Sequence, residues 1–161
     1  MKWWLIFVIC TILAWGCYVP TIHMGQGALG GLTESGKPNF KAGGLRAFLC
    51  VGLAYFLTAV IIPGIIIGVT PAEQSFTMKG TTISTLAGIF GAIGALGIIL
   101  AIRAGGHPVY IVPLVFSGAP IVGVVVGMIL HPPHNAPSPI FYAGIVLAAI
   151  GAGLVLFAKP A

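Results

Sequence analysis

Five long apolar runs, separated by shorter and more polar segments, set the pattern of the chain. They cover residues 3–20, 47–69, 82–104, 109–130 and 140–158. Because an α-helix rises about 1.5 Å per residue, about 20 apolar residues cross the roughly 30 Å hydrocarbon core of a membrane. The runs are continuously apolar, without the alternation that outer-membrane strands require. The pattern therefore predicts an all-α integral membrane protein, with five transmembrane helices in one bundle and a single domain over residues 1–161.

Most connections between the runs are short, and one of them predicts how its two helices meet. In residues 103–108, Gly105 and Gly106 suit a left-handed helix end, and Pro108 suits the first turn of a helix. The third and fourth helices are therefore expected to be antiparallel neighbours. The exception is the glycine-rich segment 21–46, which we interpret as a loop, or in part as a continuation of the first helix.

The first run has an alternative interpretation as a cleaved secretory signal. Lys2 precedes the run, and residues 13–17 loosely match a lipoprotein cleavage box. The bulky Trp15 before Gly16 is unlike the small residues that such sites prefer. We therefore expect a retained helix.

Composition and charge agree with a membrane location. Apolar residues make up 58% of the chain and charged residues 6%, against about 25% charged in soluble domains. The net charge is +5, but its cations are scattered between apolar runs, which favours contact with lipid headgroups and not with nucleic acid. Positive residues concentrate on cytoplasmic loops, which favours a cytoplasmic C-terminus and an outside N-terminus in the cell (inner) membrane. The bias compares two cations on the N-terminal side with five on the other: Lys2 and Lys79 against Lys37, Lys41, Arg46, Arg103 and Lys159.

Regularly spaced glycines mark three of the predicted helices. Such faces let helix backbones approach closely in a membrane, either within one chain, which we expect, or between two chains. The glycines are Gly88, Gly91, Gly94 and Gly97 in one helix, Gly64 with Gly68 in another, and Gly123 with Gly127 in a third.

Polar groups and prolines indicate where a pathway for a solute lies. If the first helix continues past Pro20, four groups share roughly one side of it and line a polar cavity, the alternative being an aromatic belt at the membrane surface. These four are Trp15, Tyr18, His23 and Gln26. Pro113 and Pro120, seven residues apart, kink the fourth helix and shape that cavity, or kink a simply packed helix. Arg46 or Arg103 would attract an anionic group.

Few residues suggest other chemistry. Both carboxylates, Glu34 and Glu73, fall in connections, which argues against a cation/proton antiporter of the small multidrug-resistance type. His131 and His134 lack an evident third metal ligand, and the three cysteines fit buried apolar positions. No nucleophile elbow, phosphate loop or dinucleotide motif is present. We expect no metal, no cofactor and no enzymatic activity.

The last three runs resemble the end of a repeat of the drug/metabolite transporter superfamily (EamA-like). The matching residues are Pro120 and Ile121 in the fourth run, and Gly144 and Gly151 in the fifth. Trp15-Gly16 resembles the family's Trp-Gly pattern, with His23 near the position of the family's lysine. The resemblance implies one five-helix repeat of a ten-helix transporter, whose pathway forms between two repeats.

These features lead to three hypotheses about function. The first is a transporter of a small polar or amphipathic metabolite, which works as a homodimer, antiparallel or parallel, or with another membrane subunit. The second is a membrane scaffold or accessory subunit whose glycine faces bind a larger partner. The third is a flippase for a lipid or a lipid-linked sugar, which tolerates an apolar pathway.

Overall fold

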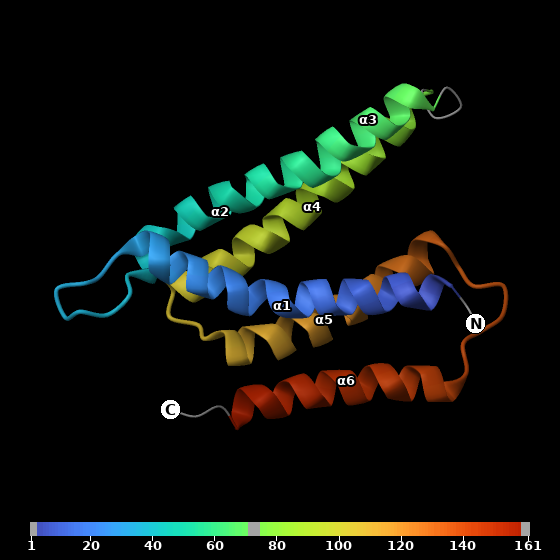
Figure 1. The fold of residues 1–161 in the computed structure, drawn as a ribbon. Helices are drawn as coiled ribbons and strands as arrows, with labels where there is room; N and C mark the ends of the chain where they lie inside the picture. Colours follow the sequence, from blue (N-terminus) through green and yellow to red (C-terminus); the bar gives the residue numbers. More distant parts are fainter. Residues whose placement is uncertain (1–2, 71–74, 159–161) are drawn as a thin grey trace. The chain divides into compact units, whose positions relative to one another are not determined.

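The structure, a computed structural model, describes residues 3–70 and 75–158 (Figure 1). Five helices in these residues are long and apolar enough to cross a membrane, and no strand occurs there. This confirms the prediction of an all-helical chain with five such helices, which is consistent with a multi-pass membrane protein. Their bounds are Trp4–Gly30, Phe40–Val69, Met78–Arg103, Pro108–Leu130 and Pro139–Phe157.

The helices form two compact units. The first, residues 1–105, contains α1 (Trp4–Gly30), α2 (Phe40–Phe56), η1 (Leu57–Ile61), α3 (Ile62–Val69) and α4 (Met78–Arg103). The second, residues 106–161, contains α5 (Pro108–Leu130) and α6 (Pro139–Phe157), which pack against each other. The five-helix bundle, and the pairing of α4 with α5, stay predictions.

The first helix is longer than its apolar run. α1 continues through Pro20 to Gly30, and α2 begins at Phe40. The prediction of a loop over residues 21–46 is therefore wrong except for residues 31–39, and the alternative of a continued helix is correct. The physical reason is that several of these glycines lie where two helices cross, so that they serve close packing and not a loop.

Residues 31–39 form the tight connection between α1 and α2. Gly31 ends α1 with a φ of 68°, and Gly36 has a φ of 74°, both in the region that favours glycine. The Thr33 N–H donates to the Lys37 carbonyl at 2.8 Å, which closes the turn. Asn39 then caps α2, because its side chain accepts a hydrogen bond from the Ala42 N–H at 3.1 Å.

A π-helix interrupts the second long helix. η1 lies between α2 and α3, and the Ile62 N–H donates to the Leu57 carbonyl, five residues earlier. Pro63 follows at once, and a proline lacks the N–H donor and clashes with the carbonyl four residues before it. The wider turn accommodates this proline, so that the helix continues from Phe40 to Val69 (Figure 1).

The connection between α4 and α5 has the predicted local chemistry. Gly105 has a φ of 97°, as expected of a left-handed helix end, and α5 begins at Pro108. His107 caps α5, because its Nδ1 accepts a hydrogen bond from the Val109 N–H at 3.3 Å. At the start of α4, the Thr77 hydroxyl likewise accepts from the Gly80 N–H at 3.2 Å.

In the first unit, α2 packs against both α1 and α4, and α1 also contacts α4. The buried apolar side chains of these helices lie toward the C-terminal ends of α1 and α4 and the N-terminal end of α2. They are Val19, Ile22, Ala47, Ala95, Ile98, Ile99 and Ile102. Four cations lie at the same end of the unit, in agreement with the predicted charge distribution: Lys37, Lys41, Arg46 and Arg103. Lys79 lies at the other end of α4. Lys2 and Lys159 lie outside the described residues.

Candidate functional site

Glycines make the closest contact in the first unit. A Cβ atom added to Gly30 would overlap the Asn39 carbonyl, and one added to Gly43 would overlap the Gln26 carbonyl. A Cβ atom on Gly44 would overlap the side-chain stem of Arg103. The backbones of α1 and α2 therefore touch at this point, and the backbone of α2 also touches the Arg103 side chain at the end of α4.

The glycine faces predicted from spacing do not pack in this way. A Cβ atom added at any of the eight positions would meet no described atom within 4 Å. The expected packing of these faces within one chain is therefore not seen in either unit, and packing between chains stays a prediction. The eight are Gly64, Gly68, Gly88, Gly91, Gly94, Gly97, Gly123 and Gly127.

Two of these glycines instead leave room for a cleft between α1, α2 and α4, with a volume of about 490 Å³. We call it the aromatic cleft, because three of its walls are aromatic side chains. Its lining includes Trp15 of α1, Phe48, Gly52 and Tyr55 of α2, and Gly88 and Gly91 of α4. The Trp15 ring lies 5.9 Å from that of Tyr18, centroid to centroid, at 53°.

A second cleft, of about 850 Å³, lies between η1 and the N-terminal half of α4. It adjoins the aromatic cleft, since Ala59, Gly88 and Ala92 line both. We call it the hydroxyl cleft after five hydroxyl groups in its lining, which come from Ser75, Thr77, Thr81, Ser84 and Thr85. In the described residues, α4 packs closely against α2 but not against η1 or α3, which leaves this space open.

The hydroxyl groups differ in how far they are already hydrogen-bonded. The Thr77 hydroxyl accepts from the Gly80 N–H, and the Thr81 hydroxyl donates to the Thr77 carbonyl at 3.0 Å. Ser84 and Thr85 have no hydrogen-bond partner in the described part of the chain. Their donors and acceptors are available to a bound molecule.

The four polar or aromatic groups predicted on α1 have different surroundings. Trp15 lines the aromatic cleft, and Tyr18 lies beside it with its hydroxyl buried and without a hydrogen-bond partner among the described residues. Gln26 is fully buried, and neither its Nε2 nor its Oε1 has a partner in residues 3–70 and 75–158. His23 stacks on Phe40, with ring centroids 4.3 Å apart, and lines neither cleft.

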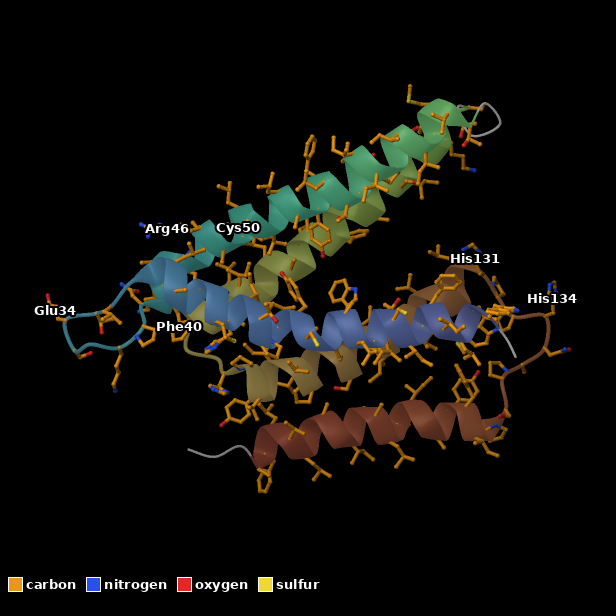
Figure 2. The ribbon with its side chains drawn as sticks, in the orientation of Figure 1. Glu34, Phe40, Arg46, Cys50, His131 and His134 are labelled. Atoms are coloured by element: carbon orange, nitrogen blue, oxygen red, sulfur yellow. The ribbon has the colours of Figure 1, made fainter. Side chains whose placement is uncertain are left out.

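The two arginines predicted to attract an anion line neither cleft. Arg46 Nη1 donates to the Leu29 carbonyl at 2.8 Å, which caps the C-terminal end of α1. Arg103 lays its side-chain stem against Gly44 at the same end of the unit. Figure 2 shows Phe40 and Arg46 near the α1–α2 connection, with Glu34 in that connection. Their contacts indicate roles in helix packing and capping.

Pro113 and Pro120 lie inside α5, in the second unit. The Ser117 hydroxyl donates to the Pro113 carbonyl and approaches the Leu114 carbonyl at 3.4 Å. A side chain of the same helix thus bonds a carbonyl near the first proline. The two prolines are far in sequence from both clefts, and their part in a pathway stays a prediction.

The described residues contain no group of three or more His, Cys, Asp or Glu side chains that could hold a metal ion. His131 and His134 are exposed in the connection between α5 and α6 (Figure 2). The cysteines are exposed, not buried as expected, and none forms a disulfide; they are Cys10, Cys17 and Cys50. An exposed apolar side chain is natural for a helix that faces lipid. Glu73 lies outside the described residues.

The hydroxyl groups of α4 are the part of the site that sequence reasoning missed. Thr81, Ser84 and Thr85 precede Gly88 and Ala92 at helical spacing, on the face of α4 that lines the hydroxyl cleft with Ala59 and Val60 of η1. This pattern of small polar and small apolar residues in one face was the available signal. The spacing of the glycines in this helix predicts close helix packing, whereas Gly88 and Gly91 line the clefts in the structure.

Comparison with family models, with curated proteins and with solved structures finds no match to this chain. The resemblance to the drug/metabolite transporter superfamily therefore stays a prediction, carried by Pro120, Ile121, Gly144, Gly151 and the Trp15-Gly16 pair.

Proposed function

We propose that the protein is a multi-pass membrane transporter of a small amphipathic metabolite, which works as a dimer of five-helix units. One observation carries the proposal: two adjoining clefts, one aromatic and one rich in hydroxyl groups, lie between helices long enough to cross a membrane. Both volumes fall in the range of about 300–1,000 Å³ that is typical of small-molecule sites, although the two clefts are open grooves lined mostly by exposed residues.

The wall that faces the hydroxyl groups of α4 supports this function. Ala59 and Val60 belong to η1 and line the hydroxyl cleft. Single π-helical turns within α-helices occur frequently at functional sites, because they shift the helix face and leave backbone groups less regularly bonded.

The distribution of carboxylates limits how transport is driven. Glu34 is the one acidic residue in the described part of the chain, and it is exposed in the connection between α1 and α2. No acidic side chain lines either cleft in that part. We therefore propose exchange or facilitated movement, without a carboxylate in the pathway that takes up and releases a proton.

We propose a second copy because several glycine faces of the helices are not covered within either unit. Six of the eight glycines line neither cleft, and an added Cβ atom there would meet no described atom within 4 Å, so that they offer faces where another chain can approach closely. Four cations at one end of the first unit favour one fixed orientation in the membrane, whereas an antiparallel homodimer requires two. Accessibility labelling of single cysteines placed at positions 35 and 158, in a cysteine-free background, decides between parallel and antiparallel copies.

Transport is tested with purified protein in liposomes that contain a panel of labelled metabolites. We expect the Trp15→Ala variant to lose exchange activity and the Trp4→Ala variant to retain it, since Trp4 is exposed at the first turn of α1 and lines neither cleft. Failure of the unmodified protein to exchange any solute, across several lipid compositions, would reject the function.

The exposed glycine faces also favour the second hypothesis, a scaffold or accessory subunit. On that hypothesis the faces bind a different membrane protein and not a second copy. Purification in mild detergent followed by native mass measurement separates the two. A homodimer supports the transporter, and stoichiometric recovery of a different protein supports the scaffold.

A further inference from the structure

We infer that the joined clefts bind an uncharged solute with a planar aromatic ring at one end and hydroxyl groups at the other, as in a nucleoside. The inference rests on the proposed transport function and names its class of substrate. It is argued from three features of the lining: the aromatic walls, the unbonded hydroxyl groups and the lack of charge.

The aromatic cleft fits a flat ring. Trp15, Phe48 and Tyr55 supply aromatic walls from two helices, and the α4 wall carries no side chain larger than that of Ala92, beside Gly88 and Gly91. Aromatic side chains favour stacked or edge-on contact with another ring, which adds to the gain from removing its surface from water. Tyr18 packs against Trp15, with ring centroids 5.9 Å apart, but it does not line the cleft and its hydroxyl is buried.

The hydroxyl cleft fits the other end of the same molecule. Ser84 and Thr85 are free of hydrogen bonds within the described residues, and they lie one helical turn from Gly88, which both clefts share. A serine or threonine hydroxyl both donates and accepts, so that it matches the hydroxyl group of a sugar. A ligand that extends past Gly88 would therefore place its ring near Trp15 and a hydroxyl group near Ser84.

The lack of charge sets the class of the solute. No Lys, Arg, Asp or Glu lines either cleft in the described part of the chain, and Arg46 and Arg103 are engaged at the far end of α4. A phosphate or carboxylate entering the clefts would lose its hydration without a counter-ion. Among the described lining residues, an organic cation would find aromatic faces but no acidic side chain.

The position of the clefts along α4 indicates how a bound solute is oriented. The hydroxyl groups extend from Ser75, just before α4, to Thr85, and Gly88 lies eleven residues after Thr77, the cap of α4, or about 16 Å at the rise of an α-helix. A bound solute is therefore expected to have its hydroxyl groups toward the start of α4 and its ring toward Trp15.

Binding is tested in detergent with a Trp3→Phe/Trp4→Phe variant, in which Trp15 is the one remaining tryptophan. Uridine is expected to quench the Trp15 fluorescence in a saturable manner. Uridine monophosphate and ribose are expected to bind at least about tenfold more weakly, because one carries charge and the other lacks the ring. Dideoxyuridine, which lacks the ribose hydroxyl groups at positions 2′ and 3′, is expected to bind several-fold more weakly.

Substitutions in the hydroxyl cleft test whether uridine binds there. Ser84→Ala/Thr85→Ala is expected to weaken uridine binding roughly tenfold while leaving dideoxyuridine unchanged. Thr82→Ala is the matched control, because Thr82 already donates to the Met78 carbonyl and does not line the hydroxyl cleft. Size-exclusion profiles and circular dichroism show whether each variant is folded, and Trp15→Phe gives a second, less disruptive test by calorimetry.

The outcomes separate this inference from the transport function. Binding or exchange of uridine monophosphate or tetraphenylphosphonium in preference to uridine would overturn the class of substrate and leave a transporter. Quenching by uridine without exchange in liposomes would support the class of ligand and overturn transport. Copurified lipid that uridine does not displace, with no quenching, would overturn the inference.

Discussion

The backbones of α1 and α2 meet where Gly30 faces Gly43. A Cβ atom added to Gly43 would lie 2.8 Å from the Gly30 amide nitrogen, and one added to Gly30 would lie 3.0 Å from the Gly43 amide nitrogen. Each glycine thus makes room for the backbone of the other helix. Because neither obstacle is a flexible side chain, a substitution at either position must separate the helices.

Gly43→Ala is expected to destabilise the first unit by about 1–3 kcal/mol, the usual cost of overpacking. Thermal or chemical unfolding in detergent measures the loss. Gly68→Ala is the matched control, since a Cβ atom there meets no described atom within 4 Å, and alanine favours a helix over glycine by about 1 kcal/mol. Equal stability of the two variants would contradict the close approach.

Arg46 is expected to stabilise the end of α1. Its guanidinium donates to the Leu29 carbonyl in the last turn, where a cation also interacts favourably with the helix dipole. Arg46→Ala should therefore lower the free energy of unfolding by about 0.5–1.5 kcal/mol. Lys41→Ala removes a nearby exposed cation for which no side-chain hydrogen bond is described, and should change stability less. A loss in transport without a loss in stability would instead favour the anion-attracting role.

The number and type of helices followed from hydropathy, because the length of an apolar run alone decides whether a helix can cross a membrane. The ends of the helices did not follow. The glycine-rich segment 21–46 is compatible by sequence with a loop or with a continued helix, and the structure places Gly27, Gly30 and Gly43 at the crossing of α1 and α2, where a residue of the other helix or of the connection requires the lack of a side chain.

The candidate site was predicted only in part, for a related reason. Trp15 was identified from α1 alone, but its partners Phe48, Tyr55 and Gly88 come from helices that the sequence does not place relative to it. Arg46 was assigned to the pathway by its charge, whereas its contact with Leu29 depends on how α2 crosses α1. Charge and polarity mark candidates, and packing decides which of them share a space.

Pro63→Ala is expected to change the wall of the hydroxyl cleft. Alanine restores an N–H that can donate to the Ala59 carbonyl, so that the π turn of η1 can convert to an α-helix. Hydrogen exchange of residues 57–63 should become slower, and the affinity for uridine should fall as Ala59 and Val60 turn away from α4. Pro20→Ala, in a helix without a described π turn, is the control. Unchanged exchange would show that the π turn does not depend on Pro63.

The side-chain amide of Gln26 is expected to lower the free energy of unfolding. Its amide is fully buried without a hydrogen-bond partner in the described residues, and a buried polar group left unpaired costs about 1–3 kcal/mol. Gln26→Met keeps the length of the side chain and removes both polar atoms. It should therefore raise the free energy of unfolding by about 1 kcal/mol or more, measured by chemical denaturation in detergent.

The same variant should lose transport if the amide bonds the solute or the water that accompanies it. Gln26 lies about 20° from Trp15 around the axis of α1, three turns further along, so that both residues face the same side of the helix. Met24→Leu, at an exposed position of α1, is the control for a general change in that helix. A Gln26→Met protein that is less stable than the original would show that the amide has a partner in the folded protein. In that case its burial would serve the fold and not the pathway.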